Sequence, residues 1–324
     1  MTKQKNNKIL EVNGLKKYFS TSRGELHAVD NVSFDIFEGQ TLGVVGESGC
    51  GKTTTGRTIL RLLEPTSGSI KFEGREITSL SSGEMRKLRS RMQIIFQDPY
   101  ASLNPRMSVS RIIAEPLVIH KMVHGKKEME KRVRELMAEV ELAGRLYSAH
   151  PHELDGGRRQ RIGIARALAL QPKFLVCDEP VSALDVSVQA QILNLMQDLQ
   201  ERLGLTYLFV THDMSVVKHI SNDIVVMYLG QMVEKAPANE LFKSQLHPYT
   251  KALIAAIPVL KPGKTNEGAI LKGELSSPIE PKPGCRFAPR CPYVRDECMK
   301  EDPPLRDLGN KRWAACFRTE ELSD

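Results

Sequence analysis

Apolar and polar positions alternate in short stretches near the start of the chain. Across 32–36, Val, Phe and Ile are separated by Ser and Asp, which is the period of a strand with one buried face. This pattern predicts strands over 9–19 and 28–37, and a shorter strand over 69–73 that follows the turn residues 65–68. We expect these pieces to form a small antiparallel sheet.

A second kind of segment is short and mostly apolar, as in strands that are buried on both faces of a sheet. Amphipathic helices separate some of these segments, and the helix over 188–203 is expected to end at Gly204. Alternating strands and helices predict a mostly parallel, doubly wound α/β sheet. The segments predicted as buried strands are 41–45, 92–96, 174–179, 206–210 and 224–229.

The stretch 108–150 has helical rather than strand periodicity. Its apolar residues recur three or four positions apart, as on one face of a helix. We interpret this stretch as a helical subdomain inserted into the α/β core. The positions that define the face are Met129, Val133, Leu136 or Met137, and Val140.

A glycine-rich loop follows the buried strand 41–45 and precedes a predicted helix over 54–63. The loop fits the P-loop pattern, in which backbone N–H groups and a helix N-terminus bind phosphates. In such a loop Lys52 reaches the β- and γ-phosphates and Thr53 holds Mg²⁺. The residues expected to contact the nucleotide are Gly46, Glu47, Ser48, Gly49, Cys50, Gly51, Lys52, Thr53 and Thr54.

Two carboxylates end the buried strand 174–179, as in a Walker B motif. Asp178 is expected to bind Mg²⁺ through water, and Glu179 to act as the general base that orients the attacking water. His212 follows the strand 206–210, so we expect it at the same sheet edge. Tyr18 or Phe19 is a candidate to stack on the adenine ring, although aromatic side chains more often pack in a core.

Composition places the chain among ordinary globular proteins. It has 324 residues, 41% hydrophobic and 26% charged, with a net charge of +7 that is spread along the sequence rather than collected in one stripe. We therefore expect no nucleic-acid partner. No signal peptide and no apolar run long enough to span a membrane is evident, so any membrane role is expected to be peripheral.

Four of the six cysteines, Cys285, Cys291, Cys298 and Cys316, lie close to the C-terminus. In a cytosolic chain this grouping favours a metal site over disulfides. The spacing lacks a C-x-x-C pair, and four thiolates suit either tetrahedral Zn²⁺ or a [4Fe–4S] cluster. Four free cysteines are the remaining alternative.

The motifs together resemble the ATP-binding subunits of ABC transporters, over nearly the whole chain. In the order of that family, the chain has the P-loop, a Q-loop at Gln97, a signature at 154–158, Asp178-Glu179, a D-loop at 182–185 and an H-loop at His212. Finer detail resembles the oligopeptide/dipeptide and nickel importer branch. The stretches Phe96–Arg106 and His247-Pro248-Tyr249 and the terminal cysteines carry this likeness, which is strongest to the dipeptide-type "F" subunit.

The resemblance implies a RecA-like P-loop core with an antiparallel β subdomain, a helical subdomain and a Cys-rich extension. We expect the core and β subdomain over 1–100 and 155–245, the helical subdomain over 101–154 and the extension over 246–324. For the four cysteines the resemblance favours [4Fe–4S] over Zn²⁺.

The resemblance also implies roles for individual residues. Gln97 would contact Mg²⁺, and His212 would contact the γ-phosphate. Two ATPase subunits would close head to tail around ATP, so that the signature of one faces the P-loop of the other. The signature residues expected at the partner's ATP are Asp155, Gly156, Gly157 and Arg158, and the D-loop residue is Asp185.

The implied partners are a related but different ABC ATPase, two transmembrane permease subunits and an extracytoplasmic solute-binding protein. The chain would act at the cytoplasmic face of the membrane and hydrolyse ATP to power uptake of dipeptides or oligopeptides. Nickel or another small solute remains an alternative cargo. A soluble ABC ATPase that acts on ribosomes or DNA, and an interaction module with an inactive site, are less favoured because the chain has a single nucleotide module with its motifs intact.

The signature departs from the family's usual Leu-Ser-Gly-Gly-Gln, because Asp155 replaces Ser and Arg158 replaces Gln. A carboxylate near the γ-phosphate repels it unless a cation offsets the charge. We therefore expect the composite site that uses this signature to be the weaker of two.

Overall fold

The computed structural model describes residues 7–257 and 277–321 and divides them into two compact units. The P-loop unit comprises Leu10–Ile36, Thr41–Thr78 and the described part of Val210–Asp324. The signature unit comprises the described part of Met1–Ile9 together with Phe37–Gln40 and Ser79–Phe209. Most of the Pro-rich stretch 258–284, for which the sequence predicts little regular structure, lies outside the described residues.

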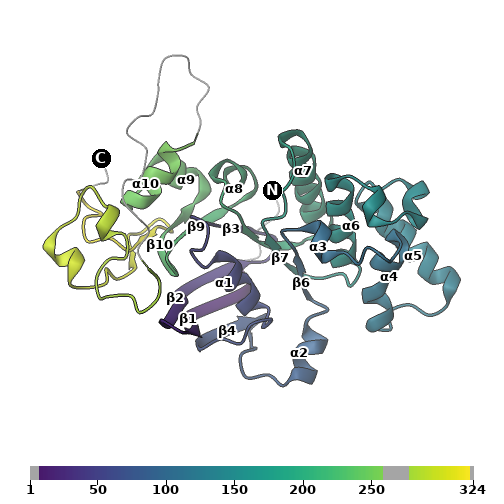
Figure 1. Ribbon diagram of the computed structural model, residues 1–324, viewed down its shortest axis with the longest axis horizontal. Coiled ribbons are helices and arrows are strands. Elements are labelled where there is room, and N and C mark those ends of the chain that lie inside the picture. Colours follow the sequence, from purple (N-terminus) through teal and green to yellow (C-terminus); the bar gives the residue numbers. More distant parts are fainter. Residues whose placement is uncertain (1–6, 258–276, 322–324) are drawn as a thin grey trace, which may run out of the picture. The chain divides into compact units, whose positions relative to one another are not determined.

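An antiparallel sheet forms one part of the P-loop unit, as the alternating pattern predicts (Figure 1). Its strand order is β2-β1-β4-β5, and β1 pairs with β4 so that Leu10 lies opposite Phe72. Both of those side chains are buried, which places the apolar face of the sheet inward. The strands are β1 (Lys8–Thr21), β2 (Gly24–Phe37), β4 (Ser67–Phe72) and β5 (Arg75–Glu76).

The second sheet segment of this unit has the order β11-β12-β10-β9-β3. The apolar strands β3 and β9 are parallel and buried, while β10, β12 and β11 continue the sheet in antiparallel fashion. The strands are β3 (Thr41–Val45), β9 (Asp223–Tyr228), β10 (Gln231–Pro237), β11 (Arg306–Asp307) and β12 (Trp313–Ala314). The helices are α1 (Lys52–Ile59), α8 (Met214–Ile220), α9 (Ala238–Lys243), α10 (Pro248–Ala255), η3 (Ala288–Arg290) and η4 (Asp296–Met299).

The signature unit contains the strands β8, β7 and β6 in that order, with β6 and β7 parallel. The helices α4, α5 and α6 pack on one another beside them (Figure 1). The strands are β6 (Met92–Ile95), β7 (Phe174–Asp178) and β8 (Thr206–Val210). The helices are α2 (Ser82–Leu88), α3 (Pro99–Ser102), α4 (Val109–Ile119), α5 (Lys126–Glu139), η1 (Gly144–Ser148), η2 (Pro151–Glu153), α6 (Gly156–Leu168) and α7 (Val186–Leu203).

The predicted fold class, a P-loop α/β fold with antiparallel and helical subdomains, is confirmed. Some helix boundaries differ from the predicted ones. The P-loop helix, predicted over 54–63, begins at Lys52 and ends at Ile59, before Arg61 adopts a positive φ of 49°. The helical stretch 108–150 breaks at Gly125, whose φ is 90°. The predicted domain boundaries at 100, 154 and 245 stay a prediction.

No helix within 7–257 or 277–321 is long and apolar enough to cross a membrane.

Candidate functional site

The P-loop connects the end of β3 to the start of α1, as the sequence predicts. Gly46 and Gly51 have positive φ angles of 153° and 103°. A Cβ on Gly46 would lie 2.2 Å from the carbonyl oxygen of Met227, and one on Gly51 would lie 2.0 Å from that of Ala28. Only glycine fits at these two positions, because the backbone of the loop runs directly against its neighbours.

Lys52 is 4% exposed, and its ammonium group lies against the start of the loop. Nζ donates to the carbonyl oxygens of Gly46 at 2.7 Å and Glu47 at 2.9 Å. This buried cation and the N-terminus of α1 together make the loop favourable for an anion. Thr53 and Thr54 lie in the first turn of α1, at the same end of the helix.

Asp178 ends β7 in the signature unit, and Glu179 follows the strand, one residue beyond its end, rather than belonging to it as the sequence predicts. Asp178 is 1% exposed, while Glu179 is more accessible and has a positive φ of 46°. Oε2 of Glu179 accepts a hydrogen bond of 2.8 Å from Nε2 of Gln97. The structure therefore brings the predicted general base and the predicted Q-loop residue together.

The signature forms the N-terminus of α6. Asp155 is the N-cap, and its Oδ1 accepts a 2.8 Å hydrogen bond from the backbone N–H of Arg158. The carboxylate also lies 3.4 Å from Nε of Arg158. Aspartate caps a helix as well as serine does, so the departure from the usual signature keeps the local structure and adds a charge that Arg158 partly offsets.

The D-loop packs directly beside the signature. A Cβ on Gly157 would lie 2.6 Å from Cγ1 of Val188, and one on Gly156 would lie 3.0 Å from Cδ2 of Leu184. Asp185 caps α7 by accepting a 3.0 Å hydrogen bond from the N–H of Val188. The two signature glycines thus allow the D-loop and the first turn of α7 to lie close to α6.

His212 lies in the P-loop unit, between β8 and α8. The next residue, Asp213, caps α8 by accepting from the N–H groups of Ser215 and Val216. The position of His212 directly before this cap agrees with the predicted H-loop, and its role stays a prediction.

The two candidate aromatic residues for adenine stacking differ in their surroundings. The ring of Tyr18 stacks on His27 with centroids 3.8 Å apart and an angle of 14°. Its hydroxyl donates to Asp30, and burial together with that hydrogen bond raises the pKa of Tyr18 well above its usual value. The ring of Phe19 instead contacts Lys17, whose Nζ lies over it at 4.7 Å from the centroid. Tyr18 is therefore the aromatic ring with a fixed orientation.

Two contacts to the P-loop were missed by sequence reasoning. Tyr249 is fully buried, and its hydroxyl accepts a 2.8 Å hydrogen bond from the N–H of Glu47. The carboxylate of Glu47 lies 2.9 Å from Nη1 of Arg290. The His-Pro-Tyr stretch was a signal only of family likeness, and nothing in the sequence pairs these residues across more than 200 positions.

His247 explains how Tyr249 is placed. Its Nδ1 accepts a 3.1 Å hydrogen bond from the N–H of Tyr249 and thereby caps α10. The acceptor role requires a neutral imidazole, and burial lowers the pKa of His247 to about 3. Pro248 occupies the first position of α10, where its missing N–H costs nothing.

The four C-terminal cysteines line one small cavity of about 20 Å³, together with His247 and Phe287. The N–H of Cys285 donates to the carbonyl oxygen of Cys298 at 2.8 Å, which ties two of the four together. Within the described residues, however, no group of three or more His, Cys, Asp or Glu side chains is arranged to hold a metal ion. The predicted metal site is therefore not confirmed.

Two regions of the chain match known protein families. Residues 29–182 match the ABC transporter family, and residues 233–298 match the oligopeptide/dipeptide transporter C-terminal region. The oligopeptide transport ATP-binding protein AppF of Bacillus subtilis is 48% identical over 98% of this chain and 99% of its own. The di/tripeptide transport ATP-binding protein DppF of Pseudomonas aeruginosa is 44% identical over 97% and 98%.

The chain belongs to the ATP-binding proteins of the oligopeptide/dipeptide ABC transporter family.

Solved structures agree with this membership. A dimer of the ATP-binding cassette MJ0796 bound to ADP and Pi is 28% identical, with a TM-score of 0.66 over 71% of this chain and 98% of its own. The protein cbiO1 of Clostridium perfringens, part of the transporter complex cbiONQ, is 30% identical, with a TM-score of 0.66 over 73% and 91%. The oligopeptide/dipeptide family member described here is thus an ABC-type ATPase, for which ATP and Mg²⁺ are implied, and a subunit of a transporter complex.

Proposed function

We propose that this ABC ATPase powers the uptake of dipeptides and oligopeptides through a membrane permease, by closing a dimer on ATP. The observation that carries the proposal is the similarity to peptide transport ATP-binding proteins over at least 97% of the chain, including the C-terminal region. The intact P-loop, with Lys52 buried against it, supports an active rather than an inactive nucleotide site.

The P-loop residues 46–54 would bind the phosphates of ATP, with Lys52 turning from the loop carbonyls toward them. Thr53 and Gln97 would hold Mg²⁺, and Asp178 would bind it through water. The ring of Tyr18 supports adenine stacking better than Phe19 does, because His27 and Asp30 fix its orientation.

Glu179 would accept a proton from the attacking water, and His212 would contact the γ-phosphate. The hydrogen bond from Gln97 supports this assignment, because an amide donor on Oε2 fixes the orientation of the carboxylate.

The signature residues Asp155, Gly156, Gly157 and Arg158 would face the ATP of a second subunit, with Asp185 beside them. A related but different ABC ATPase is the proposed partner, and the pair would dock on two permease subunits at the cytoplasmic face of the membrane. An extracytoplasmic solute-binding protein would deliver the peptide. The signature of this chain would form the weaker of the two composite sites.

The four C-terminal cysteines would bind a [4Fe–4S] cluster, with Zn²⁺ as the alternative. All four line one cavity, and four thiolates are the donor set of both groups. When bound, the group would hold together an extension whose own strands are only two residues long.

Metal analysis of the full chain, purified without oxygen, tests this site. About four irons and four acid-labile sulfides per chain would support the cluster. Zinc in a colourless protein would assign the site to Zn²⁺, and neither metal in a folded, ATP-binding chain would reject a metal site.

Transport by the intact complex tests the function. Cells that lack this chain are expected to lose uptake of labelled dipeptides, and the wild-type chain is expected to restore it. A chain with Lys52→Ala should not restore it. Loss of nickel uptake with unchanged peptide uptake would favour the alternative cargo, and loss of neither would reject the importer role.

A further inference from the structure

Two arginines of the C-terminal extension, here residues 277–321, form ion pairs around the nucleotide site. Arg290 binds Glu47, the second residue of the P-loop, through contacts of 2.9 Å and 3.2 Å from both of its terminal nitrogens. The two side chains are 7% and 25% exposed. A two-pronged, largely buried pair of this kind fixes the direction of the carboxylate as well as its position.

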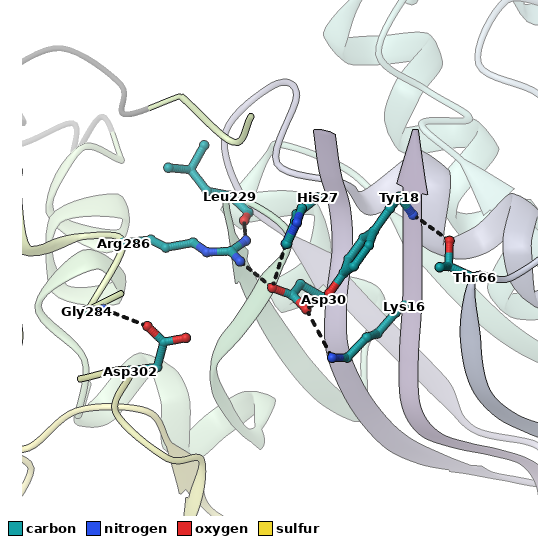
Figure 2. Close-up of polar contacts among 9 residues, drawn as sticks. All are labelled: Lys16, Tyr18, His27, Asp30, Thr66, Leu229, Gly284, Arg286 and Asp302. Carbon is teal, nitrogen blue, oxygen red and sulfur yellow. Dashed lines mark hydrogen bonds and ion pairs between the residues drawn. The ribbon is translucent and has the colours of Figure 1, made fainter. Parts of the chain in front are cut away.

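Arg286 makes the second pair. One of its terminal nitrogens donates to the carboxylate of Asp30 and the other to the carbonyl oxygen of Leu229 (Figure 2). The side chains of Arg286 and Asp30 are 7% and 13% exposed. Although burial opposes ionisation, the hydrogen bond from Tyr18 and the charge of Arg286 hold the pKa of Asp30 below its usual value.

Asp30 in turn holds the aromatic pair. Figure 2 shows its carboxylate between Arg286, the hydroxyl of Tyr18 and the ring of His27. Nδ1 of His27 lies 3.3 Å from Oδ2 of Asp30, and the His27 ring stacks on Tyr18. The contacts of Arg286 therefore reach the aromatic ring through one carboxylate.

The turn between β9 and β10 joins the two ion pairs. The N–H of Gly230 donates to the carbonyl oxygen of Cys50 at 2.9 Å, and the carbonyl oxygen of Gly230 accepts from the N–H of Asp30 at 2.8 Å. Arg286 of the extension donates to the carbonyl oxygen of the preceding residue, Leu229, and so holds the turn in place. Hydrogen bonds thus connect the P-loop, the turn and Asp30 to one another, and the extension contacts both the turn and Asp30.

We propose that Arg286 and Arg290 are positioning residues for nucleotide binding: Arg290 orders the phosphate loop through Glu47, and Arg286 orients Tyr18 through Asp30. Neither arginine has to touch the nucleotide. The inference rests on the proposed nucleotide site and assigns to the extension a role that the function above does not include.

The physical reason is preorganisation. A glycine-rich loop loses more conformational entropy on ordering than other segments do, and any loop that is ordered only on binding weakens affinity by that cost. Ion pairs that hold the loop and the ring before ATP arrives remove this cost. Loss of Arg290 should therefore weaken binding of the phosphates, whereas loss of Arg286 should weaken binding of the base.

Isothermal titration of the purified full chain with Mg-ATP and with Mg-tripolyphosphate separates the two roles. We expect Arg290→Gln to raise the Kd for both ligands about tenfold. Arg286→Gln should raise the Kd for ATP by a similar factor of about ten and change that for tripolyphosphate much less, since Arg286 reaches the P-loop only through the turn. The matched control is Arg295→Gln, an exposed arginine of the same extension that pairs with Glu321, and it should change neither Kd.

Variants at the opposite ends of the ion pairs keep the test decisive if an arginine variant does not fold. Glu47→Gln should reproduce the effect of Arg290→Gln, and the double variant should bind no more weakly than either single one. Asp30→Asn should reproduce the effect of Arg286→Gln. Arg290→Lys keeps the positive charge, so it should bind both ligands more tightly than Arg290→Gln does.

Unchanged affinities in folded variants, or equal losses of both ligands in both arginine variants, would overturn the inference. A wild-type chain that binds Mg-ATP no better than Lys52→Ala would instead reject the proposed nucleotide site itself.

Discussion

The side-chain amide of Gln97 donates a hydrogen bond of 2.8 Å to the carboxylate of Glu179. The parallel strands β6 and β7 explain this contact, because Ile95 lies opposite Cys177 and each functional residue follows two positions later. The register of two short apolar strands thus places the proposed general base beside the residue expected to respond to Mg²⁺.

We expect Glu179→Gln to lower ATP turnover of the assembled complex by at least about a hundredfold, because the amide cannot accept the proton of the attacking water. The substitution is nearly isosteric and can still pair with Gln97, so the affinity for ATP should be retained and the closed dimer should accumulate. Phosphate release and gel filtration with Mg-ATP measure the two effects. Normal turnover would remove Glu179 as the base.

The signature carboxylate can be tested apart from its capping role. Asp155→Asn and Asp155→Ser both keep an N-cap acceptor for the N–H of Arg158 but remove the charge. Both variants should therefore raise the ATPase activity of the assembled complex without a change in the urea midpoint.

Asp155→Ala is the matched control, because it removes charge and cap together. It should also lose about 1 kcal/mol of stability. Activity that is unchanged in Asn and Ser variants would show that the carboxylate does not weaken the composite site.

Removing the hydroxyl of Tyr249 should destabilise the P-loop locally. Tyr249→Phe leaves the part-buried N–H of Glu47 without its 2.8 Å acceptor, at a cost of about 1 kcal/mol. Hydrogen exchange at the Glu47 amide should become faster in this variant. Tyr293→Phe, at a 40% exposed position of the extension, should exchange as the wild type does, and equal exchange in both variants would contradict the assigned contact.

Stability of the P-loop unit should depend on pH through His247. The ordinary pKa of about 6.5 applies to the unfolded chain, whereas burial lowers the pKa in the folded chain to about 3. The unfolded state therefore binds the proton first, so stability is full above about pH 6.5 and falls as the pH decreases toward 3. As the pH falls from about 7 to about 5, this group lowers the free energy of unfolding by about 2 kcal/mol.

Urea unfolding followed by the fluorescence of Trp313, the single tryptophan, measures this effect. His247→Asn keeps an N-cap acceptor for α10 and removes the titrating group, so it should lose less stability than the wild type over the same pH interval. An equal loss in both proteins would assign the pH dependence to other groups.

The strands and the P-loop could be predicted because local pattern determines them: 41–45 and 206–210 are mostly apolar runs that the structure forms as β3 and β8 with the same bounds. Helix ends were less predictable, since Gly125 and Arg61 break helices through backbone conformation. The helix α2 was missed, although Ser81 and Glu84 form the reciprocal capping box that marks its start.

Contacts of the extension could not be predicted, because each joins residues far apart in the sequence. The ion pair between Arg290 and Glu47 spans 243 positions, and that between Arg286 and Asp30 spans 256. Neither arginine has a local pattern that distinguishes it from an exposed charge. Only the fold brings them to Glu47 and Asp30, whereas Asp155 and Asp185 reveal their capping roles by their position before a helix.

Uptake of a labelled dipeptide into vesicles that contain the whole transporter, loaded inside with Mg-ATP, tests the central claim most directly. The complex with the wild-type chain is expected to accumulate peptide against its gradient, and the complex with Glu179→Gln to bind ATP without accumulating peptide. Equal peptide accumulation with either chain, or with Mg-ADP in place of Mg-ATP, would contradict the account of this chain as the ATP-hydrolysing subunit of a peptide importer.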